Sequence, residues 1–317
     1  MRSIFTRFRA YQLGSAGSSF SFFADGHFTV VEGRLTELSR PRLIREMAVC
    51  NVETANTLHI TSWDSDHCTP SELADLLLLT RPERIEYPGY EPHSDRAEDC
   101  LAIIEAYFER NRRSNRPARL QAITPDYIGG LPESEALAFR DVLYHPRWID
   151  ELCSNNNSTV KLFRRGSFNL LSLGDVESVG ISARLRRDKY LTRETDVMIL
   201  AHHGADNGFT NKSFLERIEP SLAICSSDFD NQHDHPREEV RKLLYDQSIR
   251  LMTTKTGDII VKSIGDHTGA FRAINLKADS AEISSQCDFE AKKKLLLSHN
   301  ADTIRQLYTP RPSYRSL

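Results

Sequence analysis

The sequence lacks the features that mark disulfide-rich, membrane-spanning or nucleotide-binding proteins. Its six cysteines are scattered and form no Cys-x-x-Cys pair, which argues against a disulfide framework or a thiolate zinc site and predicts a reduced, cytoplasmic protein. The longest apolar run, near residues 76–79, is far too short to span a membrane, so we expect no membrane association. The Gly/Ser stretch at residues 14–19 lacks the Gly-Lys-Ser/Thr ending of a phosphate-binding loop and is interpreted as a turn.

An excess of charge of either sign is also missing. The chain has 41 basic and 44 acidic residues, a net charge of -3, so any contact with nucleic acid must use a local basic patch. The densest basic run has five arginines between residues 110 and 119. We interpret it as the solvated end of an amphipathic helix predicted over residues 94–113, with a nucleic-acid contact as the alternative.

One pattern recurs four times along the chain: a short apolar strand followed at once by Asp or His. A single example could be a helix cap or a surface histidine. Strand exits at one edge of packed sheets form one cleft, however, so four of them can converge there. Carboxylate and imidazole ligands without thiolates suit zinc, manganese or iron, and we expect one or two divalent ions. The residues that follow these strands are Asp64, Asp66, His67, Asp175, His202, His203 and His235.

The local motifs around these residues resemble those of the metallo-β-lactamase superfamily. They are most similar to the soluble hydrolase domain of ComEC-type competence proteins, the channel proteins of bacterial DNA uptake, which carry a His-x-Asp-x-Asp-His motif. The resemblance covers roughly residues 10–265 and follows the family order. The matching residues are Asp64, Asp66 and His67, then Asn156-Asn157-Ser158, Leu171-Ser172-Leu173-Gly174-Asp175, His202-His203-Gly204 and His235-Pro236.

The resemblance implies an α/β fold, the αββα sandwich of two mixed sheets flanked by helices. We expect this domain to span residues 1–265, with a helical insertion around 92–150. Residues 266–317 are expected to form a C-terminal strand/helix extension and a basic tail. The residue patterns also predict helices over 133–144 and 289–297, and a strand pair formed by 250–254 and 258–263.

The sequence departs from the family at one position, where Ser62 stands in place of the first histidine and Trp63 follows it. This substitution weakens one of two metal sites. The resemblance therefore implies that the better site is formed by Asp66, His67, Asp175 and one of His202 or His203. Asp64 and His235 would belong to the weaker metal site or to substrate binding.

The chemistry that the resemblance implies is metal-assisted hydrolysis, with Asp66 and Asp175 as catalytic residues. A bound cation supplies hydroxide at neutral pH, and Asp175 could bridge two ions. A phosphodiester also needs a cation near its developing charge, for which Lys161 and Lys255 are candidates.

Three functions remain open on the sequence alone. The first is a phosphodiesterase or nuclease acting on nucleic acid, with DNA favoured over RNA. Without a membrane segment, such a relative could be an antiviral defence nuclease or could work with a protein partner. The second is a hydrolase of the same fold that cleaves a small phosphodiester, a cyclic nucleotide or an ester. The third, suggested by Ser62, is a metal-poor scaffold or binding protein.

Overall fold

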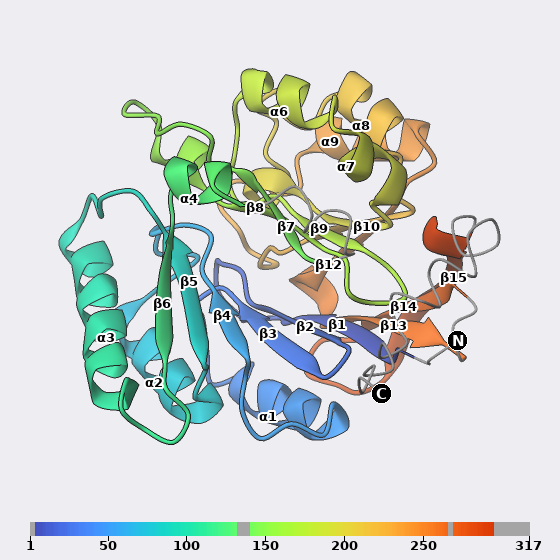
Figure 1. Ribbon diagram of the computed structural model, residues 1–317. Helices are drawn as coiled ribbons and strands as arrows, with labels where there is room; N and C mark the ends of the chain where they lie inside the picture. The colour runs from blue at the N-terminus through green and yellow to red at the C-terminus, as the bar shows by residue number, and fades with distance from the viewer. Residues whose placement is uncertain (1–3, 132–139, 266–268, 295–317) are drawn as a thin grey trace, which may run out of the picture.

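Two β-sheets face each other at the centre of the molecule, and helices cover their outer faces (Figure 1). The computed structural model describes residues 4–131, 140–265 and 269–294. This arrangement confirms the predicted αββα sandwich of two mixed sheets, since parallel and antiparallel strand pairs occur in both.

The first sheet has nine strands in the order β15-β14-β13-β1-β2-β3-β4-β5-β6. From β13 to β3 its neighbours are antiparallel, whereas β3, β4, β5 and β6 run parallel. The strands are β1 (Thr6–Ala10), β2 (Phe20–Ala24), β3 (His27–Val31), β4 (Thr57–His59), β5 (Arg84–Pro88), β6 (Arg119–Ile123), β13 (Ile259–Ile264), β14 (Ala270–Leu276) and β15 (Ile283–Glu290).

The second sheet has six strands in the order β12-β11-β10-β9-β8-β7. Its strands β9, β10, β11 and β12 are parallel, so their carboxyl ends reach the same edge. The strands are β7 (Val142–His145), β8 (Val160–Phe163), β9 (Leu170–Ser172), β10 (Val197–Ile199), β11 (Leu222–Cys225) and β12 (Arg250–Thr253).

Helices form the two outer layers. Those beside the first sheet are α1 (Arg40–Val49), α2 (Pro70–Thr80) and α3 (Asp95–Asn111). Those beside the second sheet are α6 (Val179–Leu185), α7 (Lys189–Glu194), α8 (Lys212–Ile218) and α9 (Glu238–Asp246). Short helical segments lie in the connections: α4 (Pro125–Gly129), η1 (Ser154–Asn157), η2 (Ala201–Gly204) and η3 (Thr254–Thr256).

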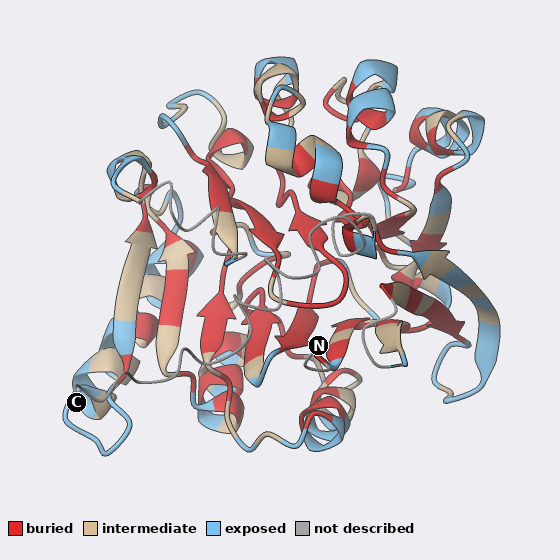
Figure 2. Ribbon diagram, turned by 45° about the vertical axis from the view of Figure 1, so that its right-hand side comes forward, coloured by how far each residue is buried: buried red, intermediate tan, exposed pale blue. Residues whose placement is uncertain are grey.

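The hydrophobic core follows from the alternation of side chains along the strands. On β10, Val197 and Ile199 pack between the sheets, while Met198 packs against the helices. Both faces of this strand are buried, as continuous apolar runs in parallel sheets require. Figure 2 shows buried residues concentrated in the strands between the two helix layers.

The stretch expected to be a helical insertion, residues 92–150, contributes strands to both sheets. Helix α3 begins at the N-cap Ser94, whose hydroxyl accepts a hydrogen bond from the Ala97 amide, and it leads into β6, which pairs with β5. The helix predicted over 133–144 is wrong in its last turn, where β7 pairs with β8. Residues 133–139 lie outside the described residues.

The boundary expected at residue 265 falls between two paired strands. Strand β14 pairs with β13, and Phe271 and Ala273 are buried in the core between the sheets. The helix expected over 289–297 is wrong at its start, because β15 continues to Glu290. Its end and the basic tail, residues 295–317, lie outside the described residues.

The strand pair expected from residues 250–254 and 258–263 does not form. Strand β12 pairs with β11 in the second sheet, and β13 pairs with β1 in the first. The chain therefore crosses between the sheets at η3 rather than turning back on itself. Among the described residues, no helix combines the length and apolar character needed to cross a membrane.

Candidate metal centre

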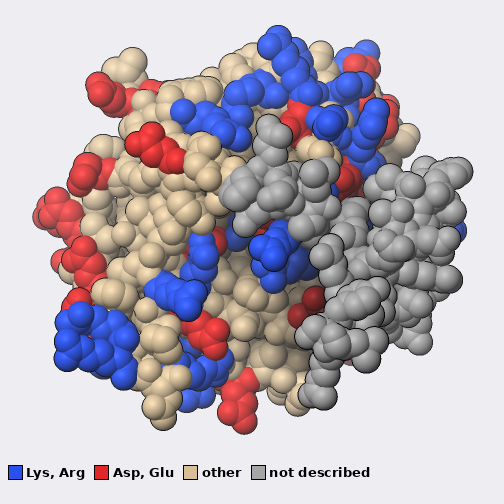
Figure 3. Space-filling model, viewed as in Figure 1, with Lys and Arg blue, Asp and Glu red and all other residues tan. Residues whose placement is uncertain are grey.

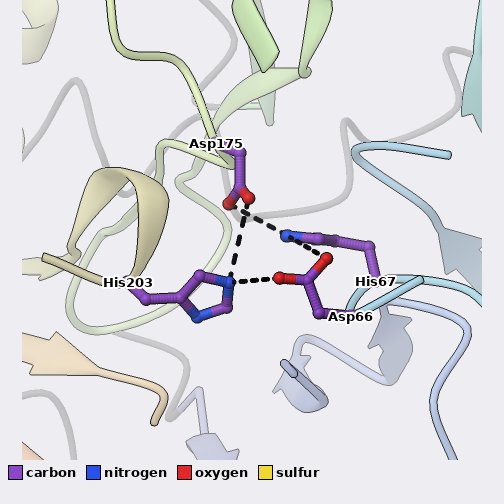
Figure 4. Close-up of side chains that lie close together, drawn as sticks. All are labelled: Asp66, His67, Asp175 and His203. Carbon is purple, nitrogen blue, oxygen red and sulfur yellow. Dashed lines mark hydrogen bonds and ion pairs between the residues drawn. The ribbon is translucent and has the colours of Figure 1, made fainter. Parts of the chain in front are cut away.

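Four of the seven residues predicted to bind metal converge at one edge of the sandwich. The side chains of Asp66, His67, Asp175 and His203 point toward one another, and one ligand atom from each lies within 4.8 Å of the others (Figure 4). His67 Nε2 is 2.9 Å from Asp175 Oδ1, and His203 Nε2 is 3.1 Å from Asp66 Oδ2. This is the one such group of metal-binding side chains within the described part of the chain.

Asp66 and His67 lie on the turn that follows β4. The His67 amide donates to the Asp64 carbonyl at 2.9 Å, and the Gly33 amide donates to the His67 carbonyl at 2.7 Å. The Ser18 amide donates to the Asp66 carbonyl at 2.9 Å. The turn is therefore fixed by backbone bonds to the first sheet, which orients both side chains toward the second sheet.

Gly174 delivers Asp175 to the cluster from the end of β9. Its φ of +55° lies in the left-handed region, and an added Cβ would stand 2.9 Å from the Ser158 Cβ and 3.2 Å from the Thr159 carbonyl oxygen. The Gly174 carbonyl also accepts a hydrogen bond from the His202 amide at 3.0 Å. Glycine is required here by both the backbone conformation and the close packing.

We expect Gly174→Ala to destabilise the fold by about 2–5 kcal/mol, combining the left-handed backbone cost with overpacking. Gly26→Ala is the matched control, because Gly26 has a φ of +74° but nothing within 4 Å of an added Cβ. Thermal unfolding of both variants measures the difference. Equal losses in the two variants would show that packing around Gly174 contributes nothing.

His203, rather than His202, enters the cluster. Both residues have left-handed backbones, with φ of 46° at His202 and 52° at His203, and this geometry directs the two rings differently. His203 Nδ1 is 2.8 Å from the Ser226 carbonyl oxygen, which leaves Nε2 facing Asp66 and Asp175. His202 Nδ1 lies instead 3.1 Å from the Glu177 carboxylate.

Glu32 supports the cluster from behind and was not predicted as a functional residue. It is 1% exposed, and its Oε1 lies 3.2 Å from His67 Nδ1. It also accepts hydrogen bonds from the Thr61 amide and hydroxyl at 3.0 and 2.6 Å. A carboxylate behind a histidine fixes its tautomer and leaves the other nitrogen for a metal. The sequence carried a signal for it, because Glu32 also directly follows an apolar strand.

The electrostatics of the cluster show strong mutual attraction. Burial opposes a charged His67, but Asp175, Glu32 and Asp66 raise the pKa of His67 well above its usual value. Burial likewise opposes a charged His203, whereas Asp175 and Asp66 raise the pKa of His203. Against burial, the two histidines lower the pKa of Asp66 and of Asp175. The two carboxylates therefore demand positive charge, which protons or a divalent cation can provide.

The geometry fits a metal ion. His67 Nε2 is a buried nitrogen without a hydrogen-bond partner among the described residues, although Asp175 Oδ1 is 2.9 Å away, because their alignment is not that of a hydrogen bond. A cavity of about 10 Å³ adjoins His67, Asp175 and His203. Two ligands at about 2.1 Å from one ion lie at most about 4.2 Å apart, so the four ligand atoms need only a small contraction.

Ser62, which stands where the family has its first histidine, lies outside the cluster and forms hydrogen bonds there. Ser62 Oγ donates to Asp64 Oδ2 at 2.7 Å and lies 3.1 Å from the Tyr90 hydroxyl. Trp63 is 4% exposed, and its indole donates to the Tyr90 carbonyl at 3.0 Å. Asp64 is thus engaged by Ser62 and does not join the four clustered side chains.

His235 lies beside the cluster. Its ring is parallel to that of His203, at 7° with centroids 6.2 Å apart, and it also contacts the His202 ring at 6.0 Å. Burial and the neighbouring imidazoles of His203, His202 and His233 lower the pKa of His235 to about 4. A neutral imidazole therefore stands at the rim of the cluster at neutral pH.

The two lysines predicted to bind substrate differ in their surroundings. Lys161 is 5% exposed and its ammonium lies 2.6 Å from Glu86 of the first sheet, so it serves as a buried link between the sheets. Lys255 lies half-buried on η3, next to Thr254, whose hydroxyl accepts a hydrogen bond from the Ser227 amide at 3.0 Å. Ser227 directly follows Ser226, whose carbonyl contacts His203. Lys255 therefore lies on a segment that is hydrogen-bonded to the support of His203.

Comparison with known proteins identifies relatives by sequence. The chain is 25% identical over 235 residues to ComE operon protein 3 of Bacillus subtilis (strain 168), covering 72% of this chain and 27% of that protein. It is 29% identical over 112 residues to competence protein ComA of Neisseria gonorrhoeae, covering 35% of this chain and 16% of that one. The chain thus spans about a quarter of the first relative's length. No protein-family model matches it.

Solved structures with a similar arrangement include the metallo-β-lactamase fold protein YhfI from Bacillus subtilis. It has a TM-score of 0.48 at 12% identity, covering 81% of this chain and 100% of that one. A diphosphatase from the PhnP family has a TM-score of 0.42 at 12% identity, covering 82% of this chain and 98% of that one.

Proposed function

Because the chain has the metallo-β-lactamase fold and matches competence proteins in sequence, we propose that it is a metal-dependent phosphodiesterase that hydrolyses nucleic acid, with DNA favoured over RNA. The observation that carries the proposal is the cluster of Asp66, His67, Asp175 and His203, whose ligand atoms lie within 4.8 Å of one another. The DNA preference rests on the resemblance to competence proteins.

The side chains divide the work between binding and orientation. Asp66, His67, Asp175 and His203 would hold one divalent ion, manganese or zinc, which would lower the pKa of a bound water toward 7. Asp66 is the most exposed of these ligands, with 34% of its side chain accessible, so its second oxygen can orient an incoming water. Neutral His235 at the rim can accept a proton or a hydrogen bond.

A metal-poor scaffold is disfavoured by the buried carboxylates. Asp175 is 3% exposed, and unpaired buried charge is costly unless a cation or a proton neutralises it. Glu32 adds a third carboxylate behind His67, which is its one ion-pair partner within the described residues. A scaffold has no need for this concentration of negative charge.

The test is to load the full chain with manganese or zinc, count bound ions by metal analysis, and assay cleavage. Substrates are labelled single- and double-stranded DNA, RNA of the same sequence, and bis-(p-nitrophenyl) phosphate. We expect about one ion per chain and cleavage that disappears with a chelator. Hydrolysis of esters alone would indicate a small substrate. Well below one ion per chain with no cleavage would refute the proposal.

We expect Glu32→Gln to weaken metal binding by roughly 10- to 100-fold, because the neutral amide no longer fixes the His67 tautomer or raises its basicity. Competition with a fluorescent chelator measures this affinity. Glu37→Gln, which replaces an exposed acid away from the cluster, is the control and should bind metal as the wild type does. Unchanged affinity in Glu32→Gln would contradict the supporting role of Glu32.

A further inference from the structure

The connection between β7 and η1 presents apolar side chains to solvent near the metal centre. Trp148 and Ile149 are 43% and 40% exposed, and Leu152 is 98% exposed. Large exposed apolar side chains that cluster on one short segment mark a binding surface more often than isolated ones do. We call residues 147–152 the rim loop.

Trp148 is held in place rather than left free. The His145 ring meets it edge-on, at 83° with centroids 5.3 Å apart, and the Arg184 guanidinium lies 5.7 Å from the indole centroid. Arg184 is fixed in turn, donating to the Tyr144 carbonyl at 3.1 Å and lying 3.0 Å from His145 Nδ1. The indole is therefore an ordered, partly exposed aromatic surface with a cation beside it.

The charge next to Trp148 is positive. Arg147 and Arg184 donate to the Tyr144 carbonyl, and in the part of the chain that the structure describes neither guanidinium has a carboxylate at salt-bridge distance. Burial, and then the charge of nearby Arg147, lower the pKa of Arg184. The nearby carboxylate of Asp188 raises the pKa of Arg184 and so opposes part of this lowering.

This positive charge continues across the helices over the second sheet. Figure 3 shows Lys and Arg side chains gathered over α6, α7 and α8. Those contributed by α6, α7 and their connection are Arg184, Arg186, Arg187, Lys189 and Arg193. The other dense basic run, residues 110–119, lies at the end of α3, where Arg116 pairs with Glu83 and Arg112 with Glu109. The α6–α7 surface is thus the better candidate for polyanion contact.

The rim loop is joined to the metal centre by hydrogen bonds. Asp150 accepts from Asn156 Nδ2 at 2.9 Å, and Asn156 Oδ1 accepts from the amides of Glu177 and Ser178. Glu177 lies two residues after Asp175 and contacts His202 Nδ1 at 3.1 Å. Helix α6 starts at the next turn, and from Val179 to Arg184, five residues further on, it rises by about 7.5 Å. Trp148 and Arg184 therefore lie on two segments that are linked, through Asn156 and Glu177, to the histidine pair beside the cluster.

From this placement we infer that Trp148, with Arg147 and Arg184, forms a stacking platform for a base of single-stranded nucleic acid whose backbone runs toward the metal centre. The inference deepens the proposed function and rests on it for the reaction, though not for binding. An aromatic ring beside arginines is how proteins hold unpaired bases without reading sequence. Bases inside a duplex cannot reach such a ring, so the platform selects single strands.

A protein partner fits this surface less well. The rim loop is flanked by the basic α6–α7 surface, which complements a polyanion. Of the two acids in the loop, Asp150 is used to shape it, accepting hydrogen bonds from the Leu152 and Cys153 amides at 3.0 and 3.2 Å. Glu151 is exposed. A protein ligand is retained as an outcome of the test.

The chain's tryptophans make binding directly observable. There are two, and Trp63 is 4% exposed, so quenching on addition of oligonucleotide reports Trp148. The experiment titrates metal-free full chain, in which cleavage is blocked, with single-stranded oligothymidylate and with a duplex of equal length. Variants are Trp148→Ala, Trp148→Phe and, as a matched exposed aromatic, Tyr245→Ala at the far end of α9, which is 83% exposed.

We expect the wild type to bind the single strand more tightly than the duplex, with quenching. Trp148→Ala should bind the single strand roughly five- to 150-fold more weakly, the loss for one stacked base. Trp148→Phe should bind within about threefold but without quenching, and Tyr245→Ala should bind as the wild type. Arg147→Ala should reduce the slope of log affinity against log salt by about 0.7.

Several outcomes would overturn the inference. They are equal binding by wild type and Trp148→Ala, equal losses in Trp148→Ala and Tyr245→Ala, or preference for the duplex. In each of these cases the exposed side chains serve another contact, such as a protein. Cleavage of DNA by wild type with no effect of Trp148→Ala would remove the platform but keep the proposed function. Trp148-dependent binding without any cleavage would keep the platform but refute the proposed function.

Discussion

Replacing Asp66 with asparagine is expected to reduce metal-dependent phosphodiester cleavage by roughly a thousandfold or more. Asparagine keeps the size of the side chain but removes one of the two negative charges that face His67 and His203. The loss of several kcal/mol of charge stabilisation corresponds to a factor of this order. Initial rates on labelled DNA and bis-(p-nitrophenyl) phosphate, with manganese saturating, measure the effect, and metal analysis reports whether the ion is retained.

Asp64→Asn is the matched control, because Asp64 lies two residues away on the same turn but is bonded to Ser62. With one ion held by the four clustered side chains, this variant should lose no more than about tenfold in rate, the range of an outer-shell change. A loss as large as that of Asp66→Asn would show that Asp64 is also a ligand. Two ions per wild-type chain would point to the same conclusion.

The location of the cluster could be predicted from the sequence because it depends on the order of elements. Asp66, Asp175 and His203 each follow a short apolar strand, and β9 and β10 are parallel neighbours whose carboxyl ends share an edge. Glycine before Asp175 marked the sharp turn that brings the carboxylate inward. Short apolar runs predicted the strands themselves. The sandwich fold was predicted from the resemblance to the metallo-β-lactamase superfamily.

The sequence could not decide which histidine of the pair enters the cluster. His202 and His203 are adjacent, and the direction of each ring depends on a left-handed backbone conformation that the sequence does not reveal. Glu32 escaped notice because its contact with His67 depends on β3 lying parallel to β4. Glu32 and Gly33 follow β3 much as Gly174 and Asp175 follow β9, but the residues around Glu32 match no family motif.

Contacts between distant segments explain the remaining differences. The partners of Lys161 and Trp148 lie on other elements, Glu86 on β5 and Arg184 on α6, and nothing local to either residue indicates them. Strands β12 and β13 are close in sequence and separated by a turn, which is typical of a hairpin, yet each completes a different sheet. Their destinations depend on which edge of the sandwich each can extend.

Lys161→Met is expected to destabilise the fold by about 3 kcal/mol, the lower part of the range for breaking a buried ion pair. The ammonium of Lys161 is 2.6 Å from Glu86, and the side chains of both residues are less than 10% exposed. Arg84, at 3.0 Å from Glu86, remains as a partner and limits the loss. Thermal unfolding should show a melting temperature lower by about 6 °C.

The pH dependence of this loss separates charge from packing. Burial opposes ionisation of Glu86, but Lys161 and His59 lower the pKa of Glu86 well below its usual value. A depressed pKa contributes stability that is present above the unfolded value, about 4.3, and is lost as the pH falls. Removing Lys161 removes most of that contribution, so the difference from wild type should be full near pH 7 and should shrink only as the pH falls below about 4.3.

The double variant Lys161→Met, Glu86→Leu completes the test, because it removes both buried charges and should recover most of the stability. Arg84 also loses Glu86, but its side chain is 38% exposed and still donates to the Tyr127 hydroxyl at 2.8 Å. Lys212→Met is the surface control, since its ammonium is 3.6 Å from Glu216 and its side chain is 68% exposed, so we expect a change within about 0.5 kcal/mol. If Lys161 instead contacted substrate, Lys161→Met would raise KM at an unchanged melting temperature. That result would support Lys161 as a substrate-binding residue and would show that its ion pair with Glu86 does not stabilise the fold.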